Sequence, residues 1–587
     1  MSNRPPLAAC ATLLCLLALA PAAHAAGIAI SPQPGTPTAM PATQISFLGA
    51  ASGSLSHVQV VGSRSGHHAG RLRAYSSAGG VSFIANRPFV ADEHVRVRAL
   101  WRDGSRTITL RTHFKVAQPA AVPLTEFAAT PGSAADVQSF HSLPALQPPS
   151  VIVHQPAGAG SAPGYVFAAP FLGPGQYGPM IFDSAGNLVW FHAVPAEQDA
   201  ADFRTQVFHG KNDLTWWQGR TIQLGYGLGA DVIANANYKT VAVVRAGNGL
   251  QADEHEFDVT AHGAAFVLAY SPVRADLSSA GGPSSGVAIE GVIQEIDIHT
   301  GLVMWEWHSL AHVAPGESYS KLPAAPGAAY DYFHINSLAV DGNGNLLISA
   351  RNTWALYDID ARNGGLIWRL GGKRSSFKLG AGVQFAYQHN ATWVSRNEIS
   401  LFDDEGAPPV NPPSRGEFVA LDTQTHTATL AGQLVHTGAP LQTNSQGDLQ
   451  ALPGGGYMIG WGGLPNLTEF DVHGQIVYDA QLPAGENSYR IYRLPWAGQP
   501  TAAPAVAATT AGATTTVYAS WNGATTVASW QLLAGADAAH LNPVAIVPRS
   551  GFETTLTTPA AATVQVRALS ASGKVLASSA PLSPTPA

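Results

Sequence analysis

The sequence predicts an all-β protein in which a six-bladed β-propeller is flanked by N-terminal and C-terminal immunoglobulin-like β-sandwiches. Three observations lead to this prediction. The chain has 587 residues, which allows two to four domains at about 150 residues each. Its middle part repeats a unit of about 40 to 55 residues six times, and each unit contains four short strand patterns, as in a β-propeller. The flanking stretches alternate short strand patterns with turn signals, which is typical of β-sandwiches.

Residues 1–26 have the features of an export signal. Arg4 supplies the positive end, residues 7–19 the apolar stretch, and Ala23-His24-Ala25 a small-residue cleavage site. Both cysteines, Cys10 and Cys15, lie inside this segment. We therefore expect a mature chain without disulfides or thiolate nucleophiles. No later stretch is apolar over the roughly 18 residues that a membrane helix needs, so we expect an exported, periplasmic or extracellular protein with no membrane span.

The charge balance argues against polyanionic partners for the chain as a whole. Charged residues make up 12% of the sequence, and the formal net charge is −7. A chain with this balance has no overall basic field to attract phosphate backbones or anionic lipid headgroups. We expect neither nucleic acid nor a membrane surface as a partner. The oligomeric state does not follow from the sequence.

Residues 27–118 are predicted to form the N-terminal β-sandwich. Alternating strand patterns bounded by turn residues occur at 44–48, 57–61, 72–75, 94–100 and 107–115. The following segment, 119–163, is rich in proline, alanine and glycine and is predicted to be a linker or a wrapping segment. No chemistry is assigned to either part.

Residues 164–499 are predicted to form the propeller. The clearest repeat begins at His334, passes through a hairpin with an Asp-Gly-Asn-Gly turn at 341–344, and ends at Trp368. Other copies begin at His255, at Gln388-His389 and at Ser445, and two weaker copies lie around 166–191 and 215–244. The segment 489–494 is expected to return and complete the first blade. Residues 500–587, with strand patterns at 515–521 and 562–569, are predicted to form the C-terminal sandwich.

Three histidines occupy the same place in their repeats. Because the first strand of each blade lines the central channel of a propeller, His255, His334 and His389 are expected to face one shared space. Asn336 follows His334 in the same blade, and antiparallel pairing is expected to bring Arg351 back beside that start. A guanidinium there suits an oxyanion, because its donors match planar or tetrahedral oxygens. Alternatively, Arg351 pairs with an acid such as Asp341 or Asp403.

Several of these segments, in this order, resemble the 3′-phosphoadenylyl-independent arylsulfotransferases, also called aryl-sulfate sulfotransferases. The resemblance runs from about residue 202 to residue 500, and the present sequence is a divergent example of it. It is carried by the segments Asp253-Glu254-His255-Glu256-Phe257, Asp331-Tyr332-Phe333-His334-Ile335-Asn336-Ser337, Leu347-Ile348-Ser349-Ala350-Arg351, Gln388-His389-Asn390-Ala391, Ile399-Ser400-Leu401-Phe402-Asp403 and Ser488-Tyr489-Arg490-Ile491-Tyr492-Arg493.

The resemblance implies a ping-pong transfer between two small molecules, an aryl sulfate donor and a phenolic acceptor, with no cofactor and no metal. His389 would be the nucleophile and would carry the sulfuryl group as N-sulfohistidine. His255, His334 and Arg351 would hold the sulfuryl oxygens and assist proton transfer, and Asn336 would bind and orient the substrate. A sulfuryl group spreads its charge over three oxygens, as a phosphoryl group does, so positioning and cationic donors are expected to carry most of the catalysis.

Three other interpretations remain open from the sequence. The chain could be a non-enzymatic exported propeller that binds aromatic or sulfated ligands. The segments 297–305 and 360–368 resemble the Asp…Gly…Trp repeats of quinone-dependent dehydrogenases. Zinc could bind the three histidines, although no acidic residue is evident beside them and Arg351 would repel a cation. His308 and His312 have helical spacing, but a solvated loop is the expected environment for both.

Overall fold

The computed structural model describes residues 27–77 and 79–587, so the expected leader with both cysteines lies outside the described residues. The described chain is all-β: it consists of strands, irregular segments and short 3-10 helices. The 3-10 helices are η1 (Ala134–Asp136), η2 (Ser278–Ala280), η3 (Ser309–Ala311), η4 (Pro315–Glu317) and η5 (Arg351–Thr353). Within the described part of the chain, no helix is long and apolar enough to cross a membrane.

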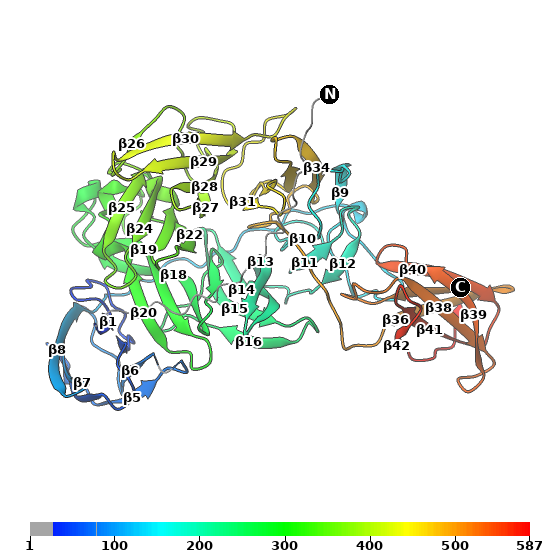
Figure 1. Cartoon of the computed structure of the whole chain (residues 1–587), viewed down its shortest axis with the longest axis horizontal. Coiled ribbons are helices and arrows are strands. Elements are labelled where there is room, and N and C mark those ends of the chain that lie inside the picture. Colours follow the sequence, from blue (N-terminus) through cyan, green and yellow to red (C-terminus); the bar gives the residue numbers. More distant parts are fainter. Residues whose placement is uncertain (1–26, 78) are drawn as a thin grey trace, which may run out of the picture.

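Residues 27–118 form two packed sheets at one end of the molecule, drawn in blue in Figure 1. One sheet contains β1 (Ala29–Ser31), β2 (Ile45–Leu48), β6 (Gly80–Ala85) and β5 (Gly70–Ala74); the other contains β4 (Gly66–His67), β3 (Leu55–Gly62), β7 (His94–Asp103) and β8 (Arg106–Lys115). Strand β7 alternates strictly, because Val95 and Val97 enter the core while Arg96 and Arg98 face solvent. The strand patterns expected at 44–48, 57–61, 72–75, 94–100 and 107–115 all coincide with observed strands.

The middle of the chain forms six sheets in sequence order, and all are antiparallel except for one short parallel strand at the edge of two of them. Their strands are β10 (Tyr165–Ala168), β11 (Met180–Phe182), β12 (Leu188–Phe191) and β35 (Tyr492–Leu494); β13 (Asp199–Phe208), β14 (Lys211–Ile222), β15 (Tyr226–Ala234) and β16 (Thr240–Val244); β17 (Phe257–Val259), β18 (Ala264–Ala275), β19 (Gly286–Asp297) and β20 (Val303–His308), with β21 (Ala329–Asp331) beside β19; β22 (Ile335–Val340), β23 (Leu346–Ala350), β24 (Ala355–Ile359) and β25 (Leu366–Gly371); β27 (His389–Ser395), β28 (Glu398–Asp403), β29 (Arg415–Asp422) and β30 (Thr427–Leu434), with β26 (Lys378–Leu379) beside β30; and β31 (Asp448–Ala451), β32 (Tyr457–Gly460), β33 (Asn466–Phe470) and β34 (Ile476–Gln481).

These sheets follow one another around a common centre, from cyan through green to gold in Figure 1. The first strands of successive sheets contact each other: β13 contacts β17, β22 contacts β27, and β27 contacts β31. The late strand β35 pairs with β10 and also contacts β13 and β32. The strand that follows the sixth sheet in sequence, β35, therefore completes the first sheet, as the sequence predicts for 489–494. The arrangement is β-propeller-like.

The same aspartate-capped turn recurs in three of the sheets and explains why these hairpins form. In each turn an aspartate side chain accepts hydrogen bonds from the backbone N–H groups two and four residues later, at 2.8 to 2.9 Å. A glycine with positive φ stands three residues after the aspartate, where any other residue would strain the backbone. The three turns are 183–187, 341–345 and 471–475.

Residues 119–163 run along the outside of the sheets before β10 begins. Pro119 forms a bridge with Val273 and Glu126 with Ile222, and β9 (Ile152–Gln155) adds an outer strand to β34. This course is that of a wrapping segment, one of the two forms expected from its composition. The N-terminal sandwich packs its β1-β2-β6-β5 sheet against β20, where Ser46 Oγ donates to the Val303 carbonyl at 2.5 Å.

Residues 500–587 form two further sheets, drawn in orange and red at the opposite end of the molecule from the N-terminal sandwich (Figure 1). Their strands are β36 (Ala505–Ala511), β37 (Thr514–Ser520), β40 (Glu553–Pro559) and β43 (Thr585–Pro586) in one sheet, and β38 (Ser529–Gly535), β39 (Leu541–Pro548), β41 (Thr563–Leu569) and β42 (Val575–Ser578) in the other. Trp530 lies in the core between them. Asn522 joins this unit to the first of the six sheets by two hydrogen bonds with the backbone of Phe191.

Candidate functional site

Three histidines from three consecutive sheets meet among the innermost strands. His255 lies in the turn before β17, His334 directly precedes β22, and His389 is the first residue of β27. The rings of His255 and His334 are perpendicular, with centroids 5.1 Å apart. The Tyr489 ring lies 5.1 Å from that of His255 and 6.2 Å from that of His389. All four side chains are buried, so the equivalent repeat positions do converge on one place.

Arg351 reaches the same place from the end of β23. Its backbone N–H donates to the carbonyl of His334 at 2.8 Å, which is the return that antiparallel pairing predicts. The guanidinium donates to the Asn444 carbonyl at 2.8 Å, and its carbon lies 4.8 Å from the centroid of the Tyr387 ring. Among the described residues it has no ion pair with any acid, so the pairing with Asp341 or Asp403 is not found. Its charge is therefore available to an anion.

Asn336 is completely buried in β22. Its Nδ2 donates to the carbonyl of Gln388 at 2.7 Å, and its own carbonyl accepts a hydrogen bond from the Tyr489 hydroxyl at 2.8 Å. Because Gln388 directly precedes His389, these contacts hold the backbone that carries the histidine. The amide nitrogen is thus engaged with protein, whereas Oδ1 has no hydrogen-bond partner among the described residues.

Each of the three histidines has a carboxylate on its Nδ1 atom. Asp253 lies 2.5 Å from His255, Asp331 lies 2.5 Å from His334, and Asp404 lies 2.7 Å from His389. The sequence-based expectation that no acidic residue accompanies these histidines is therefore wrong. A carboxylate on one ring nitrogen fixes the orientation of the imidazole and determines which nitrogen carries the proton.

The second nitrogen of His389 accepts a hydrogen bond. The backbone N–H of Gln446 donates to Nε2 at 3.3 Å, so Nε2 carries a lone pair and the ring proton lies on Nδ1, toward Asp404. Burial, together with the charges of Arg351, His255 and His334, holds the pKa of His389 well below 6.5. Burial also lowers the pKa of His334, partly offset by Asp331. His389 is thus a neutral imidazole with one unprotonated nitrogen.

Four residues around the cluster have left-handed backbone conformations. The φ angles are 57° at His334, 59° at Tyr387, 50° at Asn390 and 68° at Gln446. Such conformations are uncommon outside glycine and cost of order 1 to 3 kcal/mol each. They persist where the surroundings over-determine them, and such residues concentrate at functional sites.

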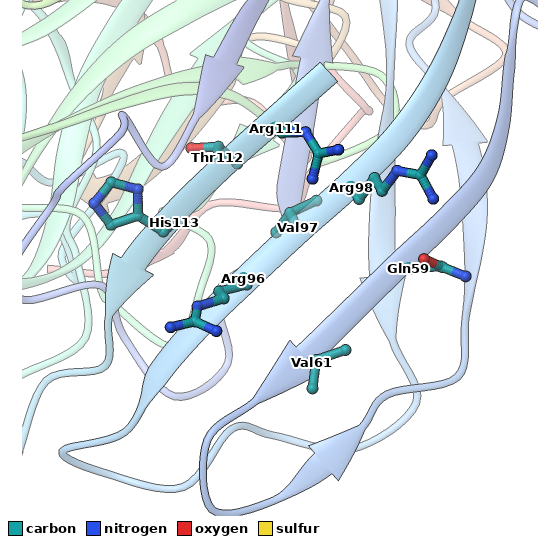
Figure 2. Close-up of a pocket in the computed structure, with 8 residues that line it drawn as sticks. All are labelled: Gln59, Val61, Arg96, Val97, Arg98, Arg111, Thr112 and His113. Carbon is teal, nitrogen blue, oxygen red and sulfur yellow. The ribbon is translucent and has the colours of Figure 1, made fainter. Parts of the chain in front are cut away.

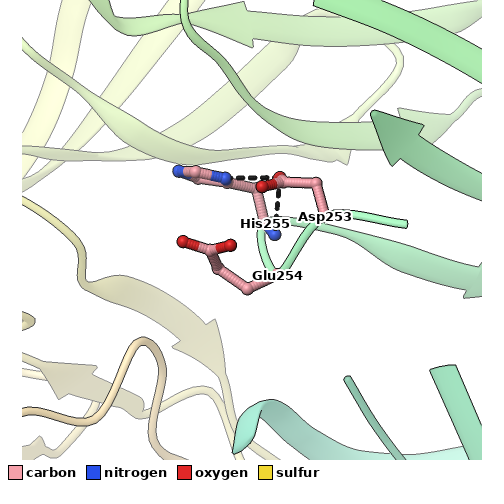
Figure 3. Close-up of side chains that lie close together, drawn as sticks. All are labelled: Asp253, Glu254 and His255. Atoms are coloured by element: carbon pink, nitrogen blue, oxygen red, sulfur yellow. Dashed lines mark hydrogen bonds and ion pairs between the residues drawn. The ribbon is translucent and has the colours of Figure 1, made fainter. Parts of the chain in front are cut away.

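Asp253, Glu254 and His255 offer atoms within 4.8 Å of one another, as metal ligands would (Figure 3). Both oxygens of Asp253 are already engaged: Oδ1 accepts from the backbone and Nδ1 of His255, and Oδ2 from the Gly227 N–H at 2.6 Å. Burial and the neighbouring Asp253 raise the pKa of Glu254 well above its usual range. A neutral Glu254 beside a fully bonded Asp253 fits a hydrogen-bond network that orients His255.

A row of aromatic rings leads away from Arg351. Tyr387 lies over the guanidinium, Trp354 lies 5.3 Å from Tyr387, and Tyr319 stacks on Trp354 at 3.8 Å. Tyr319 is 40% exposed, so the row extends from solvent to the cationic end of the cluster. Two nearby aromatic residues do not belong to this row. Phe385 is buried in the core beneath its sheet, and Trp461 is buried in the core of the next sheet.

Two further sequence-based expectations find structural explanations. His308 is 1% exposed, not in a solvated loop, because it ends β20 and hydrogen-bonds to both Glu290 and Glu306. The Asp…Gly…Trp segments are turns between the third and fourth strands of their sheets. Asp297 and Asp360 accept backbone hydrogen bonds in these turns, which accounts for the resemblance to the dehydrogenase repeats.

Three of the four residues that sequence analysis missed had detectable signals. Asp253 and Asp331 stand two and three residues before their histidines, inside segments already singled out. Asp404 follows β28, whose Phe402 pairs with His389 across the hairpin, so strand pairing would have found it. Gln446 gave no signal, because only the tertiary fold brings its backbone N–H to His389.

Comparison with known proteins identifies one family. Residues 204–482 match the family model described as arylsulfotransferase (ASST). The matched range contains His255, His334, Asn336, Arg351 and His389. No curated protein matches the chain.

Solved structures resemble the chain only at low levels. A protein of unknown function from Bacteroides caccae is 13% identical, with a TM-score of 0.35, and covers 56% of this chain and 98% of its own. A luciferin-regenerating enzyme is 10% identical, with a TM-score of 0.28, covering 58% and 99%. A GH43 protein from Bacillus licheniformis is 8% identical, with a TM-score of 0.27, covering 65% and 88%. Similarity at this level carries no information about activity.

Proposed function

Through residues 204–482 this chain belongs to the arylsulfotransferase family, and on that premise we propose that it transfers a sulfuryl group from an aryl sulfate to a phenolic acceptor. The transfer is ping-pong, and His389 carries the group as N-sulfohistidine between the two halves. The protein is exported with removal of residues 1–26 and acts in the periplasm or outside the cell. The six sheets of 164–499 are the blades of a propeller, and 27–118 and 500–587 are immunoglobulin-like sandwiches.

One observation carries the proposal: His389 is oriented as a nucleophile. Its Nδ1 faces Asp404 at 2.7 Å, and its Nε2 accepts the Gln446 N–H. A buried neutral imidazole with a lone pair on Nε2 can attack sulfur at neutral pH without first losing a proton. The aryl sulfate must displace the long Gln446 contact to reach this nitrogen.

In the first half-reaction, Nε2 of His389 attacks the sulfur of the aryl sulfate. The N–S bond forms as the bond between sulfur and the phenolic oxygen breaks, and the phenolate leaves with that electron pair. Substitution on Nε2 leaves the Nδ1 proton in place, so the ring becomes cationic. Burial raises the pKa of Asp404 well above its usual range, and a cationic ring 2.7 Å away favours the ionised carboxyl. Asp404 then stabilises this cation across the existing hydrogen bond, as a buried carboxylate does for an imidazolium in acyl transfer.

In the second half-reaction, the oxygen of an acceptor phenol attacks the same sulfur. The N–S bond breaks, its electron pair returns to Nε2, and the aryl sulfate product leaves. The phenolic proton must pass to a base as the new bond forms. His334 is suited to accept it, because burial lowers its pKa and keeps it neutral before the reaction, while Asp331 can stabilise it once protonated.

The sulfuryl oxygens are held by Arg351, with His255 and His334 beside it. The guanidinium has no acidic partner among the described residues, and its fork of donors matches sulfate oxygens. Charge that builds up on these oxygens in the transition state is then met by donors that are already in place. Asn336 acts by positioning the His389 backbone through Gln388.

The aromatic row supports the proposal of aryl substrates. Rings of donor or acceptor can stack on Tyr387 and Trp354 while the sulfuryl group meets Arg351. Tyr319, at the exposed end of the row, would receive the ring first. Phenols leave and accept more readily than alkyl alcohols, because their pKa of about 10 is low for an alcohol.

The test is a two-substrate assay on the mature chain with p-nitrophenyl sulfate and a second phenol. Coloured nitrophenol should appear in a stoichiometric burst without acceptor and continuously with it. Mass spectrometry of the peptide containing His389 should then show one added sulfuryl group. His389→Ala should abolish the burst and the adduct, whereas the exposed His473→Ala should leave both unchanged. An unaltered burst in His389→Ala, or ligand binding without turnover, contradicts the proposal.

A further inference from the structure

The N-terminal sandwich has a charge opposite to that of the rest of the chain. Residues 27–118 contain ten Lys and Arg against three Asp and Glu, a net charge of +7, although the whole chain has −7. Residues 119–587 contain 20 basic and 35 acidic residues. Nine of the ten basic residues in the sandwich are arginines. The overall charge therefore conceals one strongly basic unit.

Three of the nine arginines, Arg96, Arg98 and Arg111, lie together on the outer face of the β4-β3-β7-β8 sheet (Figure 2). We call this surface the arginine face and define it by Arg96 and Arg98 of β7, Arg111 and His113 of β8, and Gln59 of β3, which line a shallow hollow. All five side chains are exposed. The opposite sheet of the sandwich packs on β20, so the arginine face points away from the six sheets and is accessible.

One pair of like charges stands directly opposite across the two strands, because Arg98 pairs with Arg111. On the same face Arg96 stands opposite His113. Cross-strand pairs of like charge destabilise a sheet. None of the hydrogen bonds or ion pairs among the described residues involves the guanidinium of Arg96, Arg98 or Arg111. Of the three acids of the domain, Asp92 pairs with Lys115, Glu93 is buried, and Asp103 ends β7 opposite Arg106.

The spacing of this array suits a chain of anionic groups. Alternate residues on a strand are roughly 6.6 Å apart and neighbouring strands roughly 4.8 Å apart, so the guanidinium groups form a small two-dimensional lattice. Each can bind a sulfate or carboxylate through two parallel hydrogen bonds. An anion between Arg98 and Arg111 would also relieve the repulsion between them.

We propose that the arginine face binds an anionic polysaccharide outside the cytoplasm and anchors the enzyme to it. Apart from His113, none of the residues that line the hollow has an aromatic ring, whereas single-stranded nucleic acid is bound largely through base stacking. None is a large apolar residue of the kind that enters a lipid interface. Export by the leader would present the face to extracellular polymers. The proposal is independent of sulfuryl transfer.

The test uses the mature chain with three arginines of the face replaced, Arg96→Gln, Arg98→Gln and Arg111→Gln. The matched control is Arg71→Gln, Arg73→Gln and Arg106→Gln, which removes the same charge from exposed positions of the same domain. Binding to dextran sulfate and polygalacturonate is measured by calorimetry at physiological salt, with neutral dextran as the blank. We expect the face variant to bind at least about tenfold more weakly and the control within about twofold of wild type.

Thermal unfolding without polymer supplies a second readout. Removing the Arg98–Arg111 like-charge pair should leave the face variant as stable as wild type or more so. Dextran sulfate should raise the unfolding temperature of wild type and of the control, but not of the face variant. Equal losses of polysaccharide binding in the face variant and the control variant would show that only the net charge of the domain matters. That result would overturn the proposal. Tighter binding to duplex DNA or to phosphatidylglycerol vesicles than to either polysaccharide would also overturn it.

Discussion

The Asp404 carboxylate decides which nitrogen of His389 carries the proton. Its distance of 2.7 Å from Nδ1, with the Gln446 N–H on Nε2, leaves the attacking lone pair on Nε2. An asparagine at 404 could instead donate its N–H to Nδ1 and move the ring proton to Nε2. The same carboxylate would balance the charge of the sulfonated ring. Both effects make Asp404 the most informative positioning residue of the site.

We therefore predict that Asp404→Asn lowers kcat by about 100- to 10,000-fold, the range seen when a carboxylate that orients a catalytic histidine is replaced by its amide. KM should change little, because Asp404 is completely buried. Steady-state kinetics with an aryl sulfate measures both constants. Asp422→Asn, in an exposed turn between β29 and β30, is the control. Equal kcat values in the two variants would contradict the role of Asp404.

The lowered pKa of His389 predicts the pH dependence of the first half-reaction. Because burial and nearby cations hold this pKa well below 6.5, Nε2 stays unprotonated in weak acid. The acid limb of kcat/KM should therefore lie below pH 6.5, where an unperturbed histidine would already be half protonated. Burst rates measured from about pH 4.5 to 8 test this, and a limb at 6.5 or above would disprove it.

The same shifts predict how stability depends on pH. For a histidine with a lowered folded-state pKa, the unfolded chain takes up its proton first as the pH falls. The contributions of His389 and His334 are thus complete above about pH 6.5 and decline below it. His308 has the opposite sign: burial alone lowers its pKa, but Glu290 and Glu306 raise it to about 10, so its contribution is lost as the pH rises toward 10.

At the scale of elements, a buried arginine joins the innermost parts of several sheets. Arg490 precedes β35 and is completely buried. It forms ion pairs with Asp202 of β13 and with Glu256 beside β17, and donates to the carbonyls of His255 and Asn336. The strand that completes the first sheet thus brings a cation to the carboxylates of its neighbours.

We predict that Arg490→Ala lowers the free energy of unfolding by about 3 to 5 kcal/mol, because the two buried carboxylates of Asp202 and Glu256 would then share the single guanidinium of Arg204. Urea denaturation of the mature chain measures this change. Arg567→Ala, in β41 of the C-terminal sandwich, is a control at a site without an ion pair among the described residues. A loss below about 1 kcal/mol for Arg490→Ala is typical of surface ion pairs. It would show that the Arg490 ion pairs do not hold the sheets together.

At the scale of the whole molecule, the two sandwiches sit at opposite ends (Figure 1). The C-terminal sandwich is attached to the outer strand β12 and to Tyr238, through Asn522 and Gly523. None of its residues contributes a hydrogen bond to the histidine cluster in the described chain. Removing the C-terminal sandwich should therefore lower the stability of the protein and leave the histidine cluster unchanged.

We predict that a chain ending at residue 499 keeps kcat within about twofold of the full mature chain, since distant sites without shared partners act independently. Its unfolding temperature should fall, because Phe140 and Tyr238 lose their contacts with Phe552 and Gly523. Kinetics and thermal unfolding on the same preparations separate the two effects. A large fall in kcat at unchanged stability would indicate that the C-terminal sandwich acts on the site.

Particular residues show how far sequence reasoning reaches. His255, His334 and His389 could be found because repetition places equivalent positions on equivalent strands, and Arg351 because hairpin pairing returns it to His334. His308 was misjudged, because its environment depends on Glu290 of β19, which the local sequence does not indicate. The contact of the Asn336 amide with the Gln388 carbonyl was also not foreseen, because it joins two different sheets.

The sequence by itself determined the repeated strands, the aspartate turns between them and the residue types that meet at the centre, because these depend on local patterns and periodicity. Only the tertiary structure decided which nitrogen of His389 is unprotonated, which acids accompany the histidines, and that Arg96, Arg98 and Arg111 of the first sandwich share one outward face. These features depend on side chains that are brought together from separate strands, and no local pattern encodes such contacts.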